Sequence, residues 1–208
     1  MLGILGKKIG MTHIYDGTGK MTPVTLIEAE PSLVMGLCTV EKNGYSSIML
    51  GIGERKKATK NKPKKMFIKE IRLKDKPTNK IGDLISVDMF LEGDHVDITG
   101  ITKGKGFQGG MKRWGWKGGE GGHGSMHHRR VGSIGASSFP SRVHRGKTMP
   151  GHMGSVKKTV QNLKVVKVDK TGNMLAVAGS IPGANNSYLV IKEAIKIPIN
   201  RQEVKTEK

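Results

Sequence analysis

Two glycine-rich stretches have the residue types of a nucleotide-phosphate site. The stretch GKGFQG at 104–109 matches G-x-G-x-x-G, but glycine breaks the GMKRWGWKGGEGG that follows, and Glu120 lies too close for the ribose contact of a dinucleotide fold. The run Gly146-Lys147-Thr148 ends like a P-loop, but Ser141 stands where the first glycine is required and no hydrophobic strand precedes it. We therefore expect neither stretch to bind a nucleotide cofactor.

The other candidates for catalysis or metal binding are also incomplete. His123, His127 and His128 lie close in sequence, but structural zinc prefers cysteines, none is near, and the adjacent Arg129-Arg130 pair repels cations. Cys38, the single cysteine, lies in the apolar stretch LVMGLCTV, is predicted to be buried filler, and fits a reducing compartment. Paired carboxylates in a recognisable acid–base framework are not found. The sequence predicts a protein that is not an enzyme and has no metal or cofactor.

Cations beside aromatic rings form a more complete pattern. In Lys112-Arg113-Trp114-Gly115-Trp116-Lys117 the basic groups can neutralise phosphates while the indole faces stack on unpaired bases. The alternative is that the tryptophans pack the base of a loop against the protein body. Arginine forks further along suit bidentate phosphate contacts. The histidines are predicted to hydrogen-bond or stack with RNA.

Positive charge is concentrated in two segments of this 208-residue chain, whose net charge is +19. Residues 101–158 hold 12 Lys or Arg and one acid, and residues 54–80 hold 12 and three. The remainder is nearly neutral, with 12 basic and 13 acidic residues. Such a field attracts polyanions but does not determine a fold. No apolar run is long enough to cross a bilayer, and no secretory leader is expected at the N-terminus.

The neutral remainder has the pattern of β-strands. Strands are predicted over residues 23–29, after a D-G-T-G turn, and over 33–41 and 45–52 around a type I′ turn at Asn43-Gly44. Further strands are expected at 95–102, 163–169, 173–179 and 188–194, and a helix only around 61–70. Several short strands with frequent turns indicate an all-β barrel or sandwich.

Residues 103–154 do not share this pattern. Residues 104–154 contain half of the glycines, five of the seven histidines and both tryptophans, and a hydrophobic period is missing. Because the segment lies between two β regions, it is predicted to be an extended loop anchored at both ends rather than a disordered tail. The predicted organisation is a body formed by 1–102 and 155–208, with a basic insert at about 54–80, and an extended loop at 103–154.

Dispersed stretches of the chain resemble one known family. They are MLGILGKKIGMT at 1–12, DITGITKGKGFQGGMKRW at 97–114, HGSMHHRRVGSIGASSFPSRV at 123–143, GKTMPGHMG at 146–154 and TVQNLKVVKVD at 159–169. Together, and in this order, they resemble the third protein of the large ribosomal subunit in its bacterial or organellar form. The resemblance runs from the first residue to PGANNSYLVIK near the end.

The resemblance implies a translation-protein-type β-barrel with a glycine-rich extension that threads through large-subunit ribosomal RNA. It implies binding early in assembly, near the 3′ end of that 23S-type RNA, an extension that reaches toward the peptidyl transferase centre, and contacts with neighbouring large-subunit proteins. The segment around 55–72 is shorter than in many relatives. Some members carry a methylated glutamine near the loop tip; Ser138 most closely corresponds here, so we do not expect that modification.

The sequence therefore predicts a cytoplasmic, ribosomal, RNA-binding structural protein, mainly β, with no membrane partner and no small-molecule substrate. A general nucleic-acid-binding or DNA-compacting protein and a phosphate-handling enzyme are the alternatives. Residues 54–80 either bind RNA or face another protein. The residues predicted to bind RNA are Lys103, Lys105, Lys112, Arg113, Trp114, Trp116, Lys117, His123, His127, His128, Arg129, Arg130, Arg142, His144, Arg145, Lys147, Lys157, Lys158, Lys56, Lys57, Lys62, Lys64 and Lys65.

Overall fold

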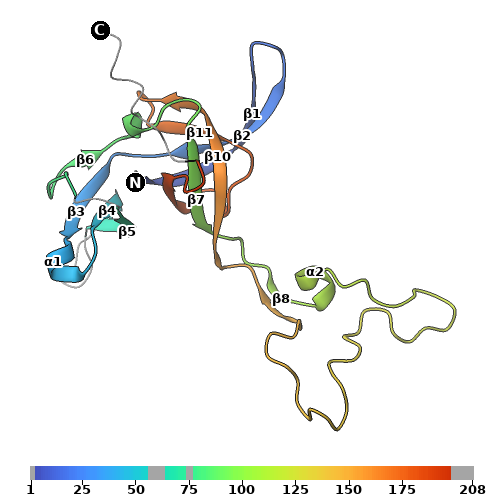
Figure 1. Ribbon diagram of the computed structural model, residues 1–208. Helices are drawn as coiled ribbons and strands as arrows, with labels where there is room; N and C mark the ends of the chain where they lie inside the picture. Colours follow the sequence, from blue (N-terminus) through green and yellow to red (C-terminus); the bar gives the residue numbers. More distant parts are fainter. Residues whose placement is uncertain (1–2, 56–63, 74–76, 198–208) are drawn as a thin grey trace. The chain divides into compact units, whose positions relative to one another are not determined.

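The computed structural model describes residues 3–55, 64–73 and 77–197 (Figure 1). Contacts within the chain divide it into two compact units, one formed by residues 1–102 and 157–208 and the other by residues 103–156. Within the described part of the chain, no helix has the length and apolar character of a membrane span. The chain is mainly β, as the sequence predicts.

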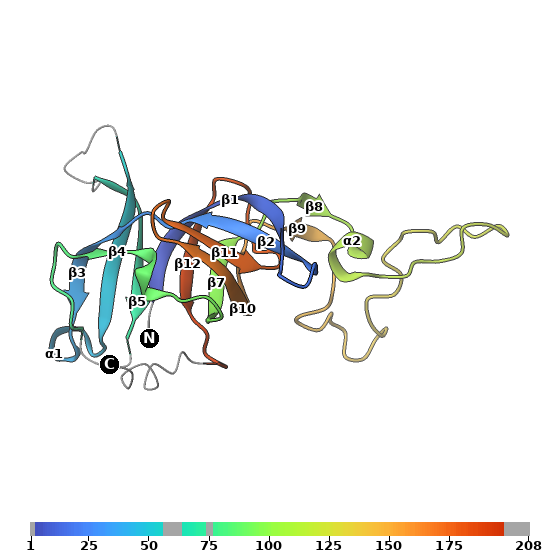
Figure 2. The same cartoon turned by 90° about the horizontal axis from the view of Figure 1, so that it is seen from above.

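The first unit contains a closed barrel in which every neighbouring pair of strands is antiparallel (Figures 1 and 2). Closure leaves no free strand edge in this sheet. In the order of the ring, the strands are β1 (Gly3–Tyr15), β12 (Tyr188–Glu193), β7 (His95–Ile101), β10 (Lys157–Asp169), β11 (Met174–Ala178) and β2 (Met21–Glu28).

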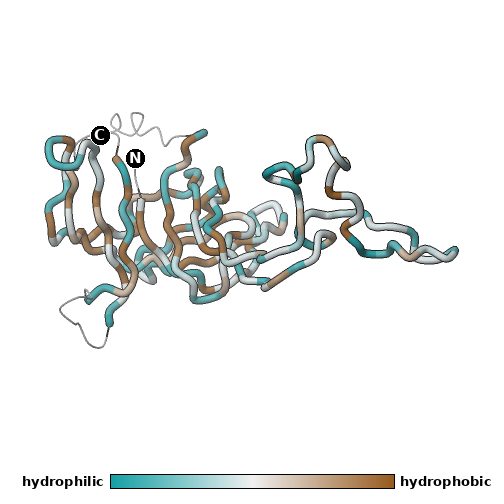
Figure 3. Tube along the Cα trace, turned by 90° about the horizontal axis from the view of Figure 1, so that it is seen from below, coloured by the Kyte–Doolittle hydropathy of each residue, from teal (hydrophilic) through white to brown (hydrophobic). Residues whose placement is uncertain are grey.

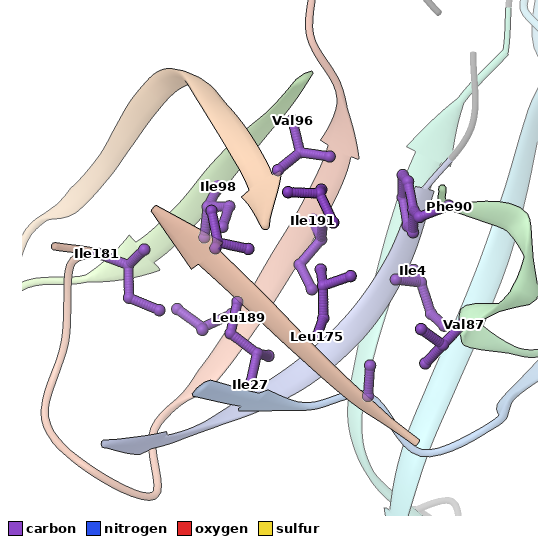
Figure 4. Close-up of a cluster of buried hydrophobic side chains, with 13 residues drawn as sticks. Ile4, Ile27, Val87, Phe90, Val96, Ile98, Leu175, Ile181, Leu189 and Ile191 are labelled. Atoms are coloured by element: carbon purple, nitrogen blue, oxygen red, sulfur yellow. The ribbon is translucent and has the colours of Figure 1, made fainter. Parts of the chain in front are cut away.

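Alternating side chains fill the barrel. On β12, Leu189 and Ile191 are fully buried, while Tyr188, Val190 and Lys192, which alternate with them, are only partly buried. This period of two is what a strand with one face on a core requires. The buried members of the other strands, together with Phe90, complete a single apolar cluster (Figure 4).

A buried carboxylate supports an irregular point of the barrel. The register of β10 against β7 shifts between Val160 and Leu163, and Asn162 there has a left-handed backbone with φ of 64°. The Asn162 amide donates to Asp97 Oδ1 at 2.9 Å, and the Ile195 amide donates to Asp97 Oδ2 at 3.4 Å. Bulges of this kind bend strands where a barrel closes.

A second, four-stranded sheet in the same unit packs on its own apolar cluster. The cluster is centred on Leu5 from β1 with Val34, Leu50 and Ile71 from the sheet. In spatial order, the strands are β5 (Lys65–Arg72), β4 (Ser47–Glu54), β3 (Ser32–Cys38) and β6 (Leu84–Ile85). A short 3-10 helix, η1 (Val87–Met89), follows β6.

Two local predictions are wrong. The helix expected around 61–70 is instead strand β5 over its described part, because residues 65–72 pair in regular register with β4, Ile68 opposite Gly51. The strands flanking Asn43-Gly44 do pair, but a helical turn, α1 (Val40–Asn43), joins them in place of a two-residue turn. Gly44 provides the left-handed conformation that ends α1, with φ of 78° and its amide on the Val40 carbonyl.

Candidate nucleic-acid interface

Residues 103–156 begin and end in a short antiparallel ladder. Strand β8 (Gly106–Gln108) pairs with β9 (Gly151–Met153), with Gln108 opposite Gly151, and the Lys105 amide donates to the Met153 carbonyl at 2.9 Å. The ladder holds together two points that lie more than 40 residues apart in sequence. The sequence predicted no regular elements in this segment, so this pairing was not expected.

A five-residue helix, α2 (Gly110–Trp114), follows the GKGFQG motif. Sequence analysis expected no helix here. Strand β8 before it belongs to a two-stranded antiparallel ladder, whereas a dinucleotide fingerprint requires a parallel βαβ unit. The second motif, Gly146-Lys147-Thr148, contains no helix or strand. Neither motif therefore has the elements of a nucleotide-phosphate site.

Side chains of α2 and of Trp116, two residues past its end, hold the returning chain. Arg113 Nη1 and Trp114 Nε1 both donate to the Met149 carbonyl, at 2.7 and 2.9 Å, and Trp116 Nε1 donates to Thr148 Oγ1 at 3.4 Å. A Cβ at Gly110 would overlap the Trp116 ring, so glycine is required at that contact.

The two tryptophans differ in how much ring surface they leave open. Trp116 is half-buried against Gly110, while Trp114 is 48% exposed and the Arg113 guanidinium carbon lies 5.1 Å from its ring centroid. The packing contacts described above are made inside residues 103–156. Stacking of either indole on a base stays a prediction, and Trp114 has the more open ring.

The histidine region turns back on itself. The Gly119 amide donates to the His128 carbonyl at 3.0 Å, and His128 Nδ1 lies 2.8 Å from the Glu120 carbonyl oxygen. A Cβ on Gly119 would collide with the His127 carbonyl, and Gly118 has φ of 78°. Among the residues that the structure describes, no three His, Cys, Asp or Glu side chains form a group able to hold a metal.

Cations of residues 103–156 lie on the surface. Of the nine Lys and Arg residues predicted to bind RNA between 103 and 145, Arg113 alone is half-buried and the others are exposed, as is Lys147. None of them forms an ion pair within the described chain, and Glu120 is the segment's single acid. Arg142, His144 and Arg145 line an open hollow of about 420 Å³. His123, with φ of 54°, is also exposed.

The predicted RNA-binding residues outside this segment fall into three groups. Lys157 and Lys158 are exposed at the start of β10. Lys64 and Lys65 face Glu54, with Nζ to carboxylate distances of 3.7 and 3.5 Å, and the Lys65 side chain is only 19% exposed. Lys65 is therefore less available than the sequence suggested. The remaining three, Lys56, Lys57 and Lys62, lie outside the described residues.

Sequence reasoning missed one cation on the barrel. Lys192 lies on the outer face of β12, and burial, together with the positive charges of Lys157 and Arg72, lowers its pKa. The signal in the sequence was the alternation in YLVIKE, which places this lysine on the face opposite the two buried residues.

A closed antiparallel barrel in one unit and a glycine-rich cationic segment in the other define the chain as a β protein with a separate basic segment. The family model described as ribosomal protein L3 matches residues 75–180. Large ribosomal subunit protein uL3 of Carboxydothermus hydrogenoformans is 46% identical over 205 residues, which cover 93% of this chain and 98% of that protein. The uL3 of Pelotomaculum thermopropionicum is also 46% identical, with 93% and 97% covered. The chain belongs to the ribosomal protein L3 family.

Proposed function

We propose that this protein acts in the large ribosomal subunit by binding large-subunit rRNA directly through its basic segment. The family is one of structural, non-enzymatic ribosomal proteins, so the chain is a structural constituent of that subunit in the cytoplasmic ribosome. The body, residues 1–102 and 155–208, is the scaffold, and residues 103–154 are the part inserted among RNA strands.

The observation that carries this proposal is the state of residues 103–156. Gly110 is the one buried residue among them, and their Lys and Arg side chains other than Arg113 are exposed and form no ion pair within the described chain. A segment without a core or acidic partners repels itself, and closely spaced phosphates remove that repulsion. Glycines allow the backbone to approach those phosphates closely.

The mechanism is charge neutralisation with release of counterions. On duplex DNA, a protein that makes six to ten phosphate contacts loses affinity by a factor of about 10³–10⁵ between 50 and 200 mM salt. By the family resemblance, the protein binds early in assembly near the 3′ end of the rRNA, and its extension reaches toward the peptidyl transferase centre. Neighbouring large-subunit proteins are further partners of the body.

Competition between large-subunit rRNA and duplex DNA at matched salt tests this proposal against general nucleic-acid binding. We expect rRNA to displace DNA efficiently while DNA displaces rRNA poorly. Equal competition by both polymers would favour the DNA-compacting alternative.

A pair of matched variants locates the binding energy. Arg129→Gln with Arg130→Gln removes two exposed charges of the basic segment, and Lys20→Gln with Lys42→Gln removes two exposed charges of the body outside residues 54–80. We expect the first pair to lower the affinity for rRNA. We also expect it to reduce the slope of log affinity against log salt concentration by about two, one for each lost phosphate contact. An equal loss from the second pair would show that net charge alone determines binding.

A further inference from the structure

A groove lies on the outer face of the barrel, within the first unit and separate from residues 103–156. Its volume is about 170 Å³, and its walls come from β7, β12 and the start of β10 on one side and from β5 of the second sheet on the other. Pockets for drug-sized ligands have volumes of about 300–1,000 Å³. The groove is therefore sized for a smaller group.

Aromatic and aliphatic side chains form the floor of the groove. The rings of Phe67 and Tyr188 stack, with centroids 4.9 Å apart and planes inclined by 8°. Val190 and Ile101 extend this apolar surface, and Ile101 is 59% exposed. Because these two rings cover each other's facing sides, a flat aromatic ligand would extend the stack on an outer ring face, and offset stacking of ring faces is favourable.

Lysines form the rim. Lys69, Lys157 and Lys192 line the groove, and the rim has one acid, Glu70. The Glu70 carboxylate accepts hydrogen bonds from the Ser47 hydroxyl and the Tyr45 hydroxyl, so part of its capacity is already used. Positive charge is in excess around Lys192, whose ammonium group is both partly desolvated and repelled.

A second hollow of about 260 Å³ adjoins the groove and shares Thr99, Lys157 and Lys192 with it. Thr99 and Thr159 line it, with their hydroxyl oxygens 2.8 Å apart. The acids Asp97 and Glu193 also line it; the Asp97 carboxylate accepts hydrogen bonds from the Asn162 and Ile195 backbone amides. Hydroxyl groups beside cations suit a sugar next to a phosphate.

We propose that this groove holds one unpaired nucleotide of RNA, with its base on the Phe67–Tyr188 floor and its phosphate at Lys157 and Lys192. This inference rests on the RNA binding proposed above and adds a second contact site, on the barrel. A nucleotide provides both a planar apolar face and an adjacent negative charge. Asp and Glu side chains of an acidic peptide provide the charge without a flat ring, so they match the rim but leave the floor unfilled.

The full chain with Lys192→Gln tests the phosphate contact, and Lys164→Gln is its control, because Lys164 is exposed on β10 and lines neither hollow. We expect Lys192→Gln to lower rRNA affinity about tenfold and to reduce the salt slope by about one. Lys164→Gln leaves both nearly unchanged. The glutamine removes a charge that is partly buried and repelled by its neighbours, so we expect the Tm of the variant to stay the same or rise. A lower rRNA affinity without a lower Tm then reports lost binding rather than lost folding.

Ultraviolet cross-linking of the wild-type complex, read by mass spectrometry, tests the base contact. We expect a nucleotide adduct on Tyr188 or Phe67, and loss of that adduct in Lys192→Gln. Adducts confined to residues 103–156, with an unchanged affinity for Lys192→Gln, would overturn the groove inference while leaving the proposed function intact. If the wild-type chain bound no rRNA, the proposed function itself would fail. If chemical cross-linking of assembled subunits joined Lys192 to a carboxylate of another protein, the occupant of the groove would be an acidic peptide, and the nucleotide proposal would be overturned.

Discussion

The barrel and the basic segment differ in what holds their backbones in place. In the barrel, alternating apolar side chains meet in one buried cluster. Hydrophobic residues, brown in Figure 3, recur along the chain of the body. In residues 103–156, hydrogen bonds to carbonyls and close glycine contacts set the path, and only Gly110 is buried. Folding free energy therefore resides in the body, while the segment provides charge and shape. Burial of apolar area is the main favourable contribution to folding.

The strongest test of this division is to remove the segment. Deleting residues 110–150 and joining the ends with a short glycine linker is expected to leave the body folded, because β8 and β9 already bring Gln108 and Gly151 together. The expected result is an unchanged Tm by calorimetry with loss of most rRNA affinity and impaired subunit assembly. A deletion variant that unfolds would show that the segment belongs to the core.

The same substitution made in each unit is the next test. Phe90 is fully buried in the barrel cluster, and Phe139 is 87% exposed. We expect Phe90→Ala to lower the free energy of unfolding by about 3–5 kcal/mol, whereas Phe139→Ala leaves it within about 0.5 kcal/mol of wild type. Urea denaturation measures both, and similar losses from the two variants would contradict the division.

A glycine pair tests whether backbone geometry orders the basic segment. Gly119→Ala places a Cβ against the His127 carbonyl, while Gly121→Ala meets nothing within 4 Å and has no left-handed φ. We expect Gly119→Ala to open the 118–128 turn, speed amide exchange there and lower rRNA affinity several-fold, with Tm unchanged. The Gly121 variant should match wild type; if both behave alike, the turn has no role in binding.

The smallest expected effect is on acid stability, and it belongs to the body alone. Hydrogen bonds from Ser47 and Tyr45 lower the pKa of Glu70 below its ordinary value of 4.5. Its stabilising contribution is therefore complete above about pH 4.5 and is lost as pH falls through the lower, folded-state pKa. We expect Glu70→Gln to flatten the decline of Tm in this range, and the 110–150 deletion to keep the wild-type slope.

Sequence patterns predicted much of the barrel but not its first strand. The strands at 23–29, 95–102 and 188–194 carry runs of β-branched residues bounded by turn signals, and they correspond to β2, β7 and β12. Strand β1 was missed because GKKIGM has no such run. Its buried Lys8 donates from Nζ to the Ile181 and Gly183 carbonyls, at 3.0 and 3.3 Å, and a contact across more than 170 residues leaves no local signal.

In the candidate interface, the sequence predicted the charge but not the elements that hold it. Strands β8 and β9 have three residues each, and α2 has five, so none produces a readable period. Their partners, the Met149 carbonyl and Thr148, lie over 30 residues away. Lys192 was missed because one lysine in a strand is usually a solvated charge, and only the barrel brings it beside Lys157.

The pairing of Gln108 with Gly151 has a consequence for how this family can vary. Since the ladder joins the two ends of the enclosed chain, the entropy of closing that loop grows only logarithmically with its length. Doubling the enclosed length adds about 0.6 kcal/mol, a small amount beside the stability of a folded domain. Insertions and deletions between these two residues are therefore nearly neutral for folding, so the length of the chain between Gln108 and Gly151 can change without loss of the body.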